Sequence, residues 1–260
     1  MKKFLKNKMF IEQLKTLNKW DKIVYCDIDG TIYRDSLFLD IINYFINDGL
    51  VDNESIERYN YLKSEWKNRN IGYEEFLMYT ITWIFEKVLN KINIDYIYNI
   101  WYSIIEKNSW KVFVYTLEQL KKYQNNWYKI IFISWSPLEL VYLFSKEYEF
   151  DIALWSLLST NNQWTLESDY VLASSQAKIE VVNYINNLYQ PSDTIAFWDT
   201  SWDYDMLINS SLWYAINPTY ELYNKIKDID NILVIIERKD LILKINKESR
   251  KYISYFDNLI

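Results

Sequence analysis

Five short, continuous apolar runs rich in β-branched residues are the feature that most restricts the fold of this chain. Each run is apolar throughout, which is typical of strands covered on both faces. Patterns typical of helices separate most of these runs, and this alternation predicts an α/β fold with a doubly wound, Rossmann-like parallel sheet. The predicted strands are Lys22–Cys26, Lys129–Ile133, Thr194–Phe197, Leu212–Ile216 and Ile232–Ile236, and the predicted helices are Leu138–Lys146, Ser175–Asn187, Tyr204–Ile208 and Tyr220–Ile226.

A long segment between the first two predicted strands has a helical pattern throughout. Within it, Leu37, Ile41, Tyr44 and Phe45 fall on one helical face. The segment is too long for a simple crossover connection, so we predict an inserted helical cap. The predicted division is an N-terminal amphipathic helix at 1–20, a core at 21–36 and 124–238, a helical cap with its hinge at 37–123, and a C-terminal helix packed on the core at 239–260.

Composition removes several classes of protein. The 260 residues include no histidine, which excludes Ser-His-Asp and Cys-His catalysis and histidine-ligated zinc. The net charge of −6 argues against a nucleic-acid partner, and no apolar run is long enough to span a membrane. One cysteine, Cys26, excludes a disulfide framework and favours the cytoplasm. Any hydrolytic chemistry must therefore use carboxylates, hydroxyls, lysine and a hard metal ion.

Two carboxylates follow the first predicted strand, in the sequence Asp27-Ile28-Asp29-Gly30-Thr31. Because they are two residues apart where a strand runs out into a loop, both can point toward the carboxyl edge of the sheet. Open α/β sheets bind their ligands at that edge. The alternative is a simple turn, in which aspartate and glycine serve only the backbone.

Further polar side chains follow the later strands. Ser134 ends the second strand, in Ile133-Ser134-Trp135-Ser136-Pro137, and Lys178 begins a predicted helix. Asp199 and Asp203 follow the third strand. Taken singly, each has a structural alternative: a turn serine, a solvated surface lysine, and two aspartates that cap a helix. Their joint occurrence in this order favours a functional site.

The order and spacing of these residues resemble the haloacid dehalogenase-like superfamily. Asp27 to Thr31 is similar to its motif I, D-x-D-G-T, and Ser134 to the hydroxyl residue of its motif II. Lys178 is similar to the lysine of motif III, and Asp199 with Asp203 to the acidic motif IV, G-D-x-x-x-D. The helical insert resembles the type 1 cap of the family, and the residues after Asp27 look most like subfamily IB, which contains the phosphoserine phosphatases.

The resemblance implies a Mg²⁺-dependent phosphomonoester hydrolase that acts on a small phosphorylated metabolite. Asp27 would be the nucleophile that forms an aspartyl-phosphate, and Asp29 the general acid and base. The implied phosphate-binding residues are Ser134, Lys178, Thr31 and Gly30. The implied metal ligands are Asp27, the carbonyl of Asp29 and Asp199, with Asp203 holding a metal-bound water.

Three questions stay open at this stage. A phosphotransferase or mutase would use the same intermediate, and a catalytically inactive relative that binds a ligand or partner is a further alternative. Ser36, preceded by Asp35, occupies the position where phosphoserine phosphatases carry a substrate-binding glutamate. This departure predicts that L-phosphoserine is not the best substrate. The sequence leaves the oligomeric state open.

Glycine is scarce and tryptophan abundant, with 3 glycines and 12 tryptophans. An average chain of this length has roughly 18 glycines. Trp135 and Trp198 stand where the family has small residues, so we expect both to crowd the site. A UGA codon that the organism reads as glycine, translated here as tryptophan, would explain the pattern. Other positions that favour glycine in the family are Trp127, Trp155, Trp164, Trp202 and Trp213.

Overall fold

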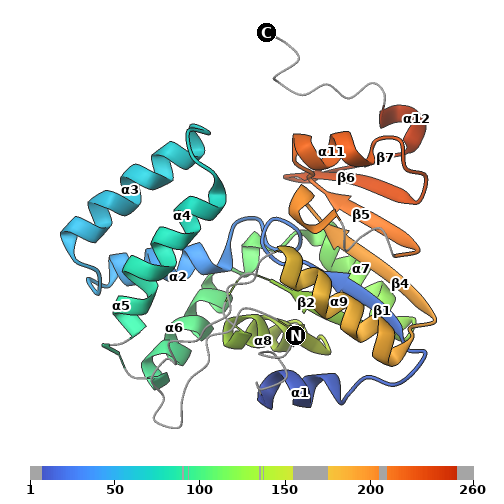
Figure 1. Cartoon of the computed structure of the whole chain (residues 1–260), viewed down its shortest axis with the longest axis horizontal. Helices are drawn as coiled ribbons and strands as arrows, with labels where there is room; N and C mark the ends of the chain where they lie inside the picture. Colours follow the sequence, from blue (N-terminus) through green and yellow to red (C-terminus); the bar gives the residue numbers. More distant parts are fainter. Residues whose placement is uncertain are drawn as a thin grey trace. The chain divides into compact units, whose positions relative to one another are not determined.

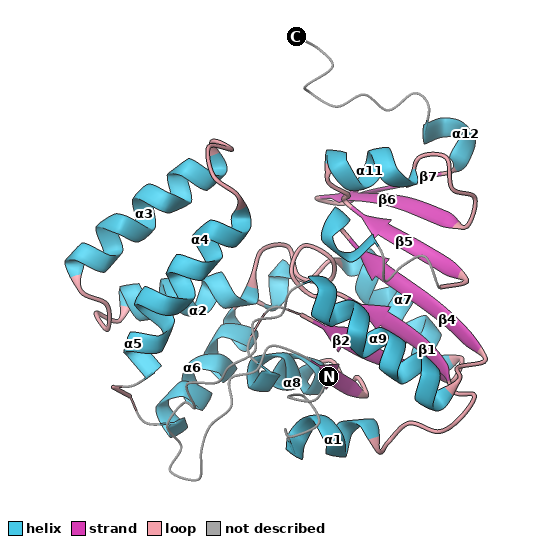
Figure 2. Cartoon of the chain, in the orientation of Figure 1, coloured by secondary structure: helices cyan, strands magenta, loops and turns pink. Residues whose placement is uncertain are grey.

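The computed structural model describes residues 8–89, 91–92, 94–134, 136, 138–154, 175–204 and 210–250. These residues form a seven-stranded sheet with the order β3-β2-β1-β4-β5-β6-β7 (Figure 2). Neighbouring strands from β3 to β6 are parallel, and β7 runs antiparallel to β6. The predicted doubly wound parallel sheet is therefore confirmed. The strands are β1 Lys22–Cys26, β2 Tyr128–Ile133, β3 Ile152–Leu154, β4 Asp193–Trp198, β5 Leu212–Ile216, β6 Ile232–Arg238 and β7 Leu241–Ile245.

Helices cover both faces of the parallel part of this sheet, which explains why the parallel strands are continuous apolar runs. Ile23 on β1 joins a core cluster with Val181 and Leu222, which come from α9 and α11. On the opposite face, Tyr123 of α7 packs edge-on against Phe197 of β4. Figure 1 shows α9 crossing one face of the sheet and α7 lying behind it. The helices of this unit are α1 Lys8–Leu14, α7 Val114–Asn125, α8 Leu138–Glu147, α9 Ser175–Tyr189, α11 Tyr220–Ile226 and α12 Lys247–Arg250.

A second compact unit is inserted after β1, and its described part is Leu37–Asn108. It is helical, as the sequence predicts, and it has its own aromatic core. Phe85 lies between Phe38 and Phe45, with ring centroids 5.1 and 6.1 Å away. No helix in the described part of the chain is long and apolar enough to cross a membrane. The elements of the insert are α2 Leu37–Asn47, α3 Asn53–Lys67, α4 Tyr73–Thr80, the π-helical turn η2 Ile81–Phe85, α5 Glu86–Leu89 and α6 Ile94–Lys107.

The two linkers that lead to the insert run side by side within the core unit. Tyr33 and Val112 form an antiparallel bridge. The backbone N–H of Arg34 donates to the carbonyl of Lys111 at 2.8 Å. The chain therefore leaves the core and returns to it along a short two-stranded ribbon, defined here as residues 32–34 and 111–113.

A buried carboxylate on β6 fixes this ribbon. Glu237 is 5% exposed and accepts a bond of 2.7 Å from Nη2 of Arg34. The same carboxylate accepts the backbone N–H groups of Val114 and Tyr115 at 3.0 and 2.9 Å. These donors belong to the first turn of α7, where no helical carbonyl can satisfy them. One glutamate thus caps a helix and anchors a linker.

The structure differs from the sequence prediction at several boundaries. Strand β3 was not predicted, because three residues are too few to show a period. The prediction of a helix from 239 onward is wrong for Leu241–Ile245, which form β7; only Lys247–Arg250 are helical. Residues 109–123, predicted to belong to the cap and hinge, lie in the core unit with α7. Residues 1–7, 205–209 and 251–260 of the other predicted helices lie outside the described residues.

Candidate active site

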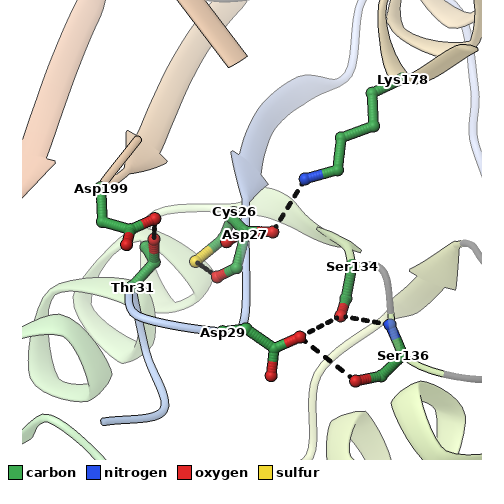
Figure 3. Close-up of polar contacts among 8 residues, drawn as sticks. All are labelled: Cys26, Asp27, Asp29, Thr31, Ser134, Ser136, Lys178 and Asp199. Atoms are coloured by element: carbon green, nitrogen blue, oxygen red, sulfur yellow. Dashed lines mark hydrogen bonds and ion pairs between the residues drawn. The ribbon is translucent and has the colours of Figure 1, made fainter. Parts of the chain in front are cut away.

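The topology selects one edge of the sheet for a ligand. Strand β1 pairs with β2 on one side and with β4 on the other, so the order of connections reverses at β1. In open α/β sheets the crevice at such a switch point, outside the carboxyl ends of the strands, is where ligands bind. The loops that follow β1, β2 and β4 carry the residues singled out in the sequence (Figure 3).

The loop after β1 is a tight turn built around one carbonyl. The carbonyl of Ile28 accepts the backbone N–H groups of Thr31, Ile32 and Tyr33 at 3.1, 3.0 and 2.9 Å. Gly30 in this turn has φ of 84°, in the left-handed region that favours glycine. The turn therefore holds the side chains before and after Gly30 in fixed directions.

Asp27 forms a buried ion pair with Lys178. Nζ of Lys178, in the first turn of α9, donates to Oδ1 of Asp27 at 3.0 Å (Figure 3). The two side chains are 1% and 6% exposed. Burying two charges is expensive, and well-packed apolar residues are often as stable or more so. The pair is therefore better explained by chemistry at Asp27 than by a need for stability.

Asp29 is held by two hydroxyls from the loop after β2. Oδ2 of Asp29 accepts from Oγ of Ser134 and from Oγ of Ser136, each at 3.2 Å (Figure 3). The backbone N–H of Ser136 donates in turn to Oγ of Ser134 at 3.0 Å. Ser136 was not assigned a role from the sequence. The only available signal was its spacing of two from Ser134.

Asp199, which directly follows β4, packs against the turn after β1. Oγ1 of Thr31 donates to Oδ1 of Asp199 at 3.3 Å. A Cβ atom at Gly30 would lie 2.1 Å from Oδ2 of Asp199. Position 30 therefore needs glycine for two reasons, its backbone angle and the closeness of this carboxylate.

The structure brings most of the predicted site residues together in three contacts: Asp27 with Lys178, Asp29 with Ser134, and Asp199 with Thr31 and Gly30. Asp203 ends the 3₁₀ turn η4 Ser201–Asp203, and its side chain lies outside the described residues.

The donor set at this edge suits a hard divalent cation. Asp27 and Asp199 offer carboxylate oxygens, and the turn offers the carbonyl of Asp29. Mg²⁺ is usually held by one or two carboxylates together with waters and substrate oxygens. Among the described residues, no group of three or more His, Cys, Asp or Glu is arranged to hold a metal ion. The oxygens at this edge are therefore of the kind that Mg²⁺ prefers, and the described residues do not form a closed protein cage.

Cys26 lies next to Asp27, the candidate nucleophile, but its thiol has low reactivity. Its side chain is fully buried, and Sγ donates to the carbonyl of Asp27 at 3.0 Å. Burial, and to a smaller extent the charge of Asp27, raises the pKa of this thiol well above its ordinary value. A thiol with a raised pKa is a poor nucleophile at neutral pH.

The tryptophans occupy contrasting environments. The sequence predicts that the indole of Trp198 crowds the cleft, but this residue, at the end of β4, is 1% exposed and packs in the apolar core cluster. The Lys178 ammonium lies 5.3 Å from the centroid of its ring. Trp198 Nε1 has no hydrogen-bond partner among the described residues.

Two further tryptophans, Trp20 and Trp127, have positive φ, 68° and 67°. The other predicted crowding residue, Trp135, lies outside the described residues, as do Trp155 and Trp164.

Comparison with known proteins finds similarity in structure and none in sequence. No family model and no curated protein matches the sequence. Among solved structures, a Bordetella pertussis protein of unknown function superposes with a TM-score of 0.65 and 10% identity, covering 79% of this chain and 94% of that one. A haloacid dehalogenase family hydrolase from Salmonella enterica gives 0.58 and 13%, covering 82% and 67%. The chain has the fold of the haloacid dehalogenase-type hydrolases.

Phosphoserine phosphatases share this haloacid dehalogenase-type fold with the chain. A substrate-bound phosphoserine phosphatase complex superposes with a TM-score of 0.57 and 19% identity, covering 91% of this chain and all of that one. Identities this low establish the fold and leave the reaction to be argued from the residues themselves. The predicted fold class is confirmed.

Proposed function

We propose that the chain is a Mg²⁺-dependent phosphomonoester hydrolase of the haloacid dehalogenase type, acting on a small phosphorylated metabolite in the cytoplasm. The observation that carries the proposal is the buried pair of Asp27 and Lys178 at the switch point of the sheet, with Asp29 two residues further along the same turn. A carboxylate nucleophile and a second carboxylate for proton transfer are what such a reaction needs from a chain without histidine.

The reaction would proceed in two steps. In the first, an oxygen of Asp27 bonds to phosphorus while the ester P–O bond breaks, and Asp29 gives a proton to the departing alcohol. In the second, Asp29 takes a proton from water as the water oxygen attacks phosphorus. The bond to Asp27 then breaks, and inorganic phosphate leaves. Asp27 and Asp29 end in their starting states.

The remaining residues would neutralise the negative charge of the reacting groups and bind the phosphate. Lys178 lies against Asp27 and would offset the negative charge gathered on the carboxylate and the phosphoryl oxygens. Mg²⁺, held by Asp27, Asp199 and the carbonyl of Asp29, would neutralise the transferring phosphoryl group. Ser134, Thr31 and Gly30 are the proposed contacts to the phosphate, and Asp203 would hold a metal-bound water.

The test is the hydrolysis of p-nitrophenyl phosphate and a panel of metabolite phosphates by the purified protein. We expect activity only with Mg²⁺, and complete loss in Asp27→Asn, because an amide is not a nucleophile. Asp21→Asn is the matched control, because Asp21 lies before β1 at the other end of that strand. Activity without any divalent metal, or an active Asp27→Asn variant, would contradict the proposal.

The substrate is expected to differ from L-phosphoserine. Ser36 stands where the phosphoserine phosphatases carry their substrate-binding glutamate. Its neighbour Asp35 forms an ion pair with Lys111 at 3.1 Å, so Asp35 is already engaged. We expect L-phosphoserine to be matched or exceeded by another ester in the panel. A tenfold preference for it in kcat/KM would overturn this assignment.

A phosphotransferase or mutase would share the aspartyl-phosphate and would reveal itself by transfer to an added alcohol in place of water. A second candidate is an inactive, ligand-binding relative. The observation that favours it is Trp198, whose large indole lies beside Lys178. Under this alternative the chain would bind phosphate without turnover.

We further infer that several tryptophans are glycine in the functional protein. The support is conformational: two of the seven non-glycine residues with positive φ in the described part of the chain are Trp20 and Trp127, and this backbone angle is strained for a bulky side chain and free of strain for glycine. The sequence of the gene decides the matter. UGA at codons 135 and 198 agrees with the inference, and UGG at both ends it.

A further inference from the structure

The loop after β2 carries two fully buried serines, and both contact the same oxygen of Asp29. Ser134 and Ser136 are 0% exposed, and each Oγ lies 3.2 Å from Oδ2. Ser134 is the residue proposed to bind the phosphate. Ser136 has no role in the mechanism given above, although it is as close to the carboxylate as Ser134.

A serine hydroxyl carries one proton and can donate it to one acceptor at a time. In this structure the hydroxyl proton of Ser134 is directed at Asp29, and its oxygen accepts the N–H of Ser136. When a phosphate binds, Ser134 must turn its proton toward the phosphate oxygen and away from Asp29. The hydroxyl of Ser136 can stay on Asp29 during that exchange.

We propose that Ser136 is a positioning residue for Asp29. Its hydroxyl holds Oδ2, so that Oδ1 is the oxygen that carries the proton to the departing alcohol and later takes one from water. The inference rests on the proposed function and adds a division of labour between the two serines. Ser134 changes partner when substrate binds, and Ser136 keeps the acid and base in place.

The test compares two esters with different leaving groups. An alkyl phosphate has a poor leaving group, and its P–O bond breaks readily only when the oxygen is protonated. The p-nitrophenolate of p-nitrophenyl phosphate is stable without a proton. A misplaced acid therefore slows the alkyl ester far more, whereas a lost phosphate contact or a general loosening of the site slows both esters alike.

For Ser136→Ala we expect kcat/KM to fall about tenfold or more on the alkyl ester and by less than about threefold on p-nitrophenyl phosphate. The KM should stay within about twofold. Ser136→Thr keeps a hydroxyl and should retain most of the alkyl-ester activity. Ser134→Ala should weaken both esters to a similar extent. Asp29→Asn should show the same selectivity as Ser136→Ala with a larger loss.

Equal losses on the two esters in Ser136→Ala, or a loss confined to KM, would overturn the proposal. Circular dichroism and thermal melting show whether each variant folds, and the alanine variant alone is sufficient for the decision. A crystal structure of Ser136→Ala supplies a measurement without turnover. A carboxylate of Asp29 that keeps its wild-type position there contradicts the proposal, and a displaced one agrees with it.

These outcomes separate the inference from the proposed function. If the wild-type protein has no phosphatase activity, the proposed function fails, and the position of Asp29 in the two crystal structures still decides what Ser136 does. If the wild type is active and Asp29→Asn shows no preference between the esters, the role assigned to Asp29 fails, and that of Ser136 fails with it.

Discussion

The two ends of the parallel strands carry the same kinds of side chain and use them differently. At the carboxyl edge, Asp27 pairs with the buried ammonium of Lys178. At the amino edge, Asp193 begins β4 and accepts bonds from the hydroxyls of Tyr128 and Ser211 and, at 2.9 Å, from the N–H of Thr194. Asp27 is matched by the full charge of a lysine from a distant helix, whereas Asp193 is matched mainly by neutral donors, with Lys22 as a smaller influence.

We interpret this difference as a difference in role, with a catalytic role proposed for Asp27 and a stabilising role for Asp193. Neutral donors satisfy a carboxylate without burying a second charge, and they suit a residue that only ties strands together. A buried ion pair costs desolvation, and on the proposed function Asp27 keeps its partner Lys178 because this carboxylate reacts with the substrate. The following predictions test this contrast, from the largest expected effect to the smallest.

Replacing the lysine at the carboxyl edge should have the largest effect. Lys178→Met removes the charge beside Asp27, and we expect kcat/KM for any accepted phosphate ester to fall by roughly 10³-fold or more. The matched control is Lys22→Met, because Lys22 begins β1 at the amino edge, where its ammonium lies 5.3 Å from the ring of Tyr128. Lys22→Met should keep wild-type activity. A Lys178→Met variant with more than a tenth of wild-type activity contradicts the contrast.

Gly30→Ala should have the next largest effect. Its added Cβ would lie 2.1 Å from Asp199, so the carboxylate or the turn must move, and we expect activity to fall about 100-fold. Gly49→Ala is the control, because Gly49 also has a positive φ but has no atom within 4 Å of the added Cβ. It should lose only about 1 kcal/mol of stability through backbone strain, with activity unchanged. Equal activity losses in the two variants would show that strain, and not crowding of Asp199, is responsible.

Asp193→Asn should affect stability and leave activity intact. Burial alone would raise the pKa of Asp193, but bonds from Ser211, Tyr128 and Thr194, with a smaller effect of the Lys22 charge, outweigh it and hold the pKa below its ordinary value. A carboxyl with a lowered pKa stabilises the fold above its unfolded pKa of about 3.9, and this contribution disappears as pH falls through the folded pKa. In urea melts we expect a loss of about 1 kcal/mol at pH 7 that shrinks toward pH 3. A loss independent of pH would refute this account.

Trp127→Gly should have the smallest effect, and of opposite sign. Trp127 precedes β2 at the amino edge, is 89% exposed and has a φ of 67°. Glycine removes this strain, so we expect a gain of about 0.5–1 kcal/mol in the free energy of unfolding. The control is Trp66→Gly, because Trp66 lies within α3 and stacks on Phe76 with centroids 5.3 Å apart. That variant should lose roughly 3 kcal/mol. A destabilised Trp127→Gly protein would argue for a genuine tryptophan.

The sequence predicts the elements whose pattern is local. Continuous apolar runs located β1 and β5 at their observed bounds, and the helix Tyr220–Ile226 was predicted at its observed ends. Strand β7 was missed because Leu241, Ile242 and Leu243 are consecutive apolar residues on an exposed edge. Such a short run is compatible with a helix or a strand.

The candidate site residues that directly follow a strand could be predicted from the sequence. The contact of Asp27 with Lys178 could be expected from the sequence, because a parallel sheet brings the residue after a strand and the start of a crossover helix to the same end of the sheet. The role of Ser136 depends on the path of the loop after β2, and that of Glu237 on contacts with α7. Neither path leaves a periodic signal in the sequence.

The two-stranded ribbon of residues 32–34 and 111–113, which contains the bridge between Tyr33 and Val112, has a consequence for the evolution of the protein. The exit and return points of the insert are neighbours within the core unit, and Glu237 bonds to residues on both sides. The cost of closing the chain between them therefore depends only weakly on the length of the insert. A gene segment coding for residues 37–108 could be shortened, exchanged or replaced by a plain hairpin turn without moving Asp27. On the proposed function, substrate recognition would then diversify in the insert while the core keeps the reaction chemistry.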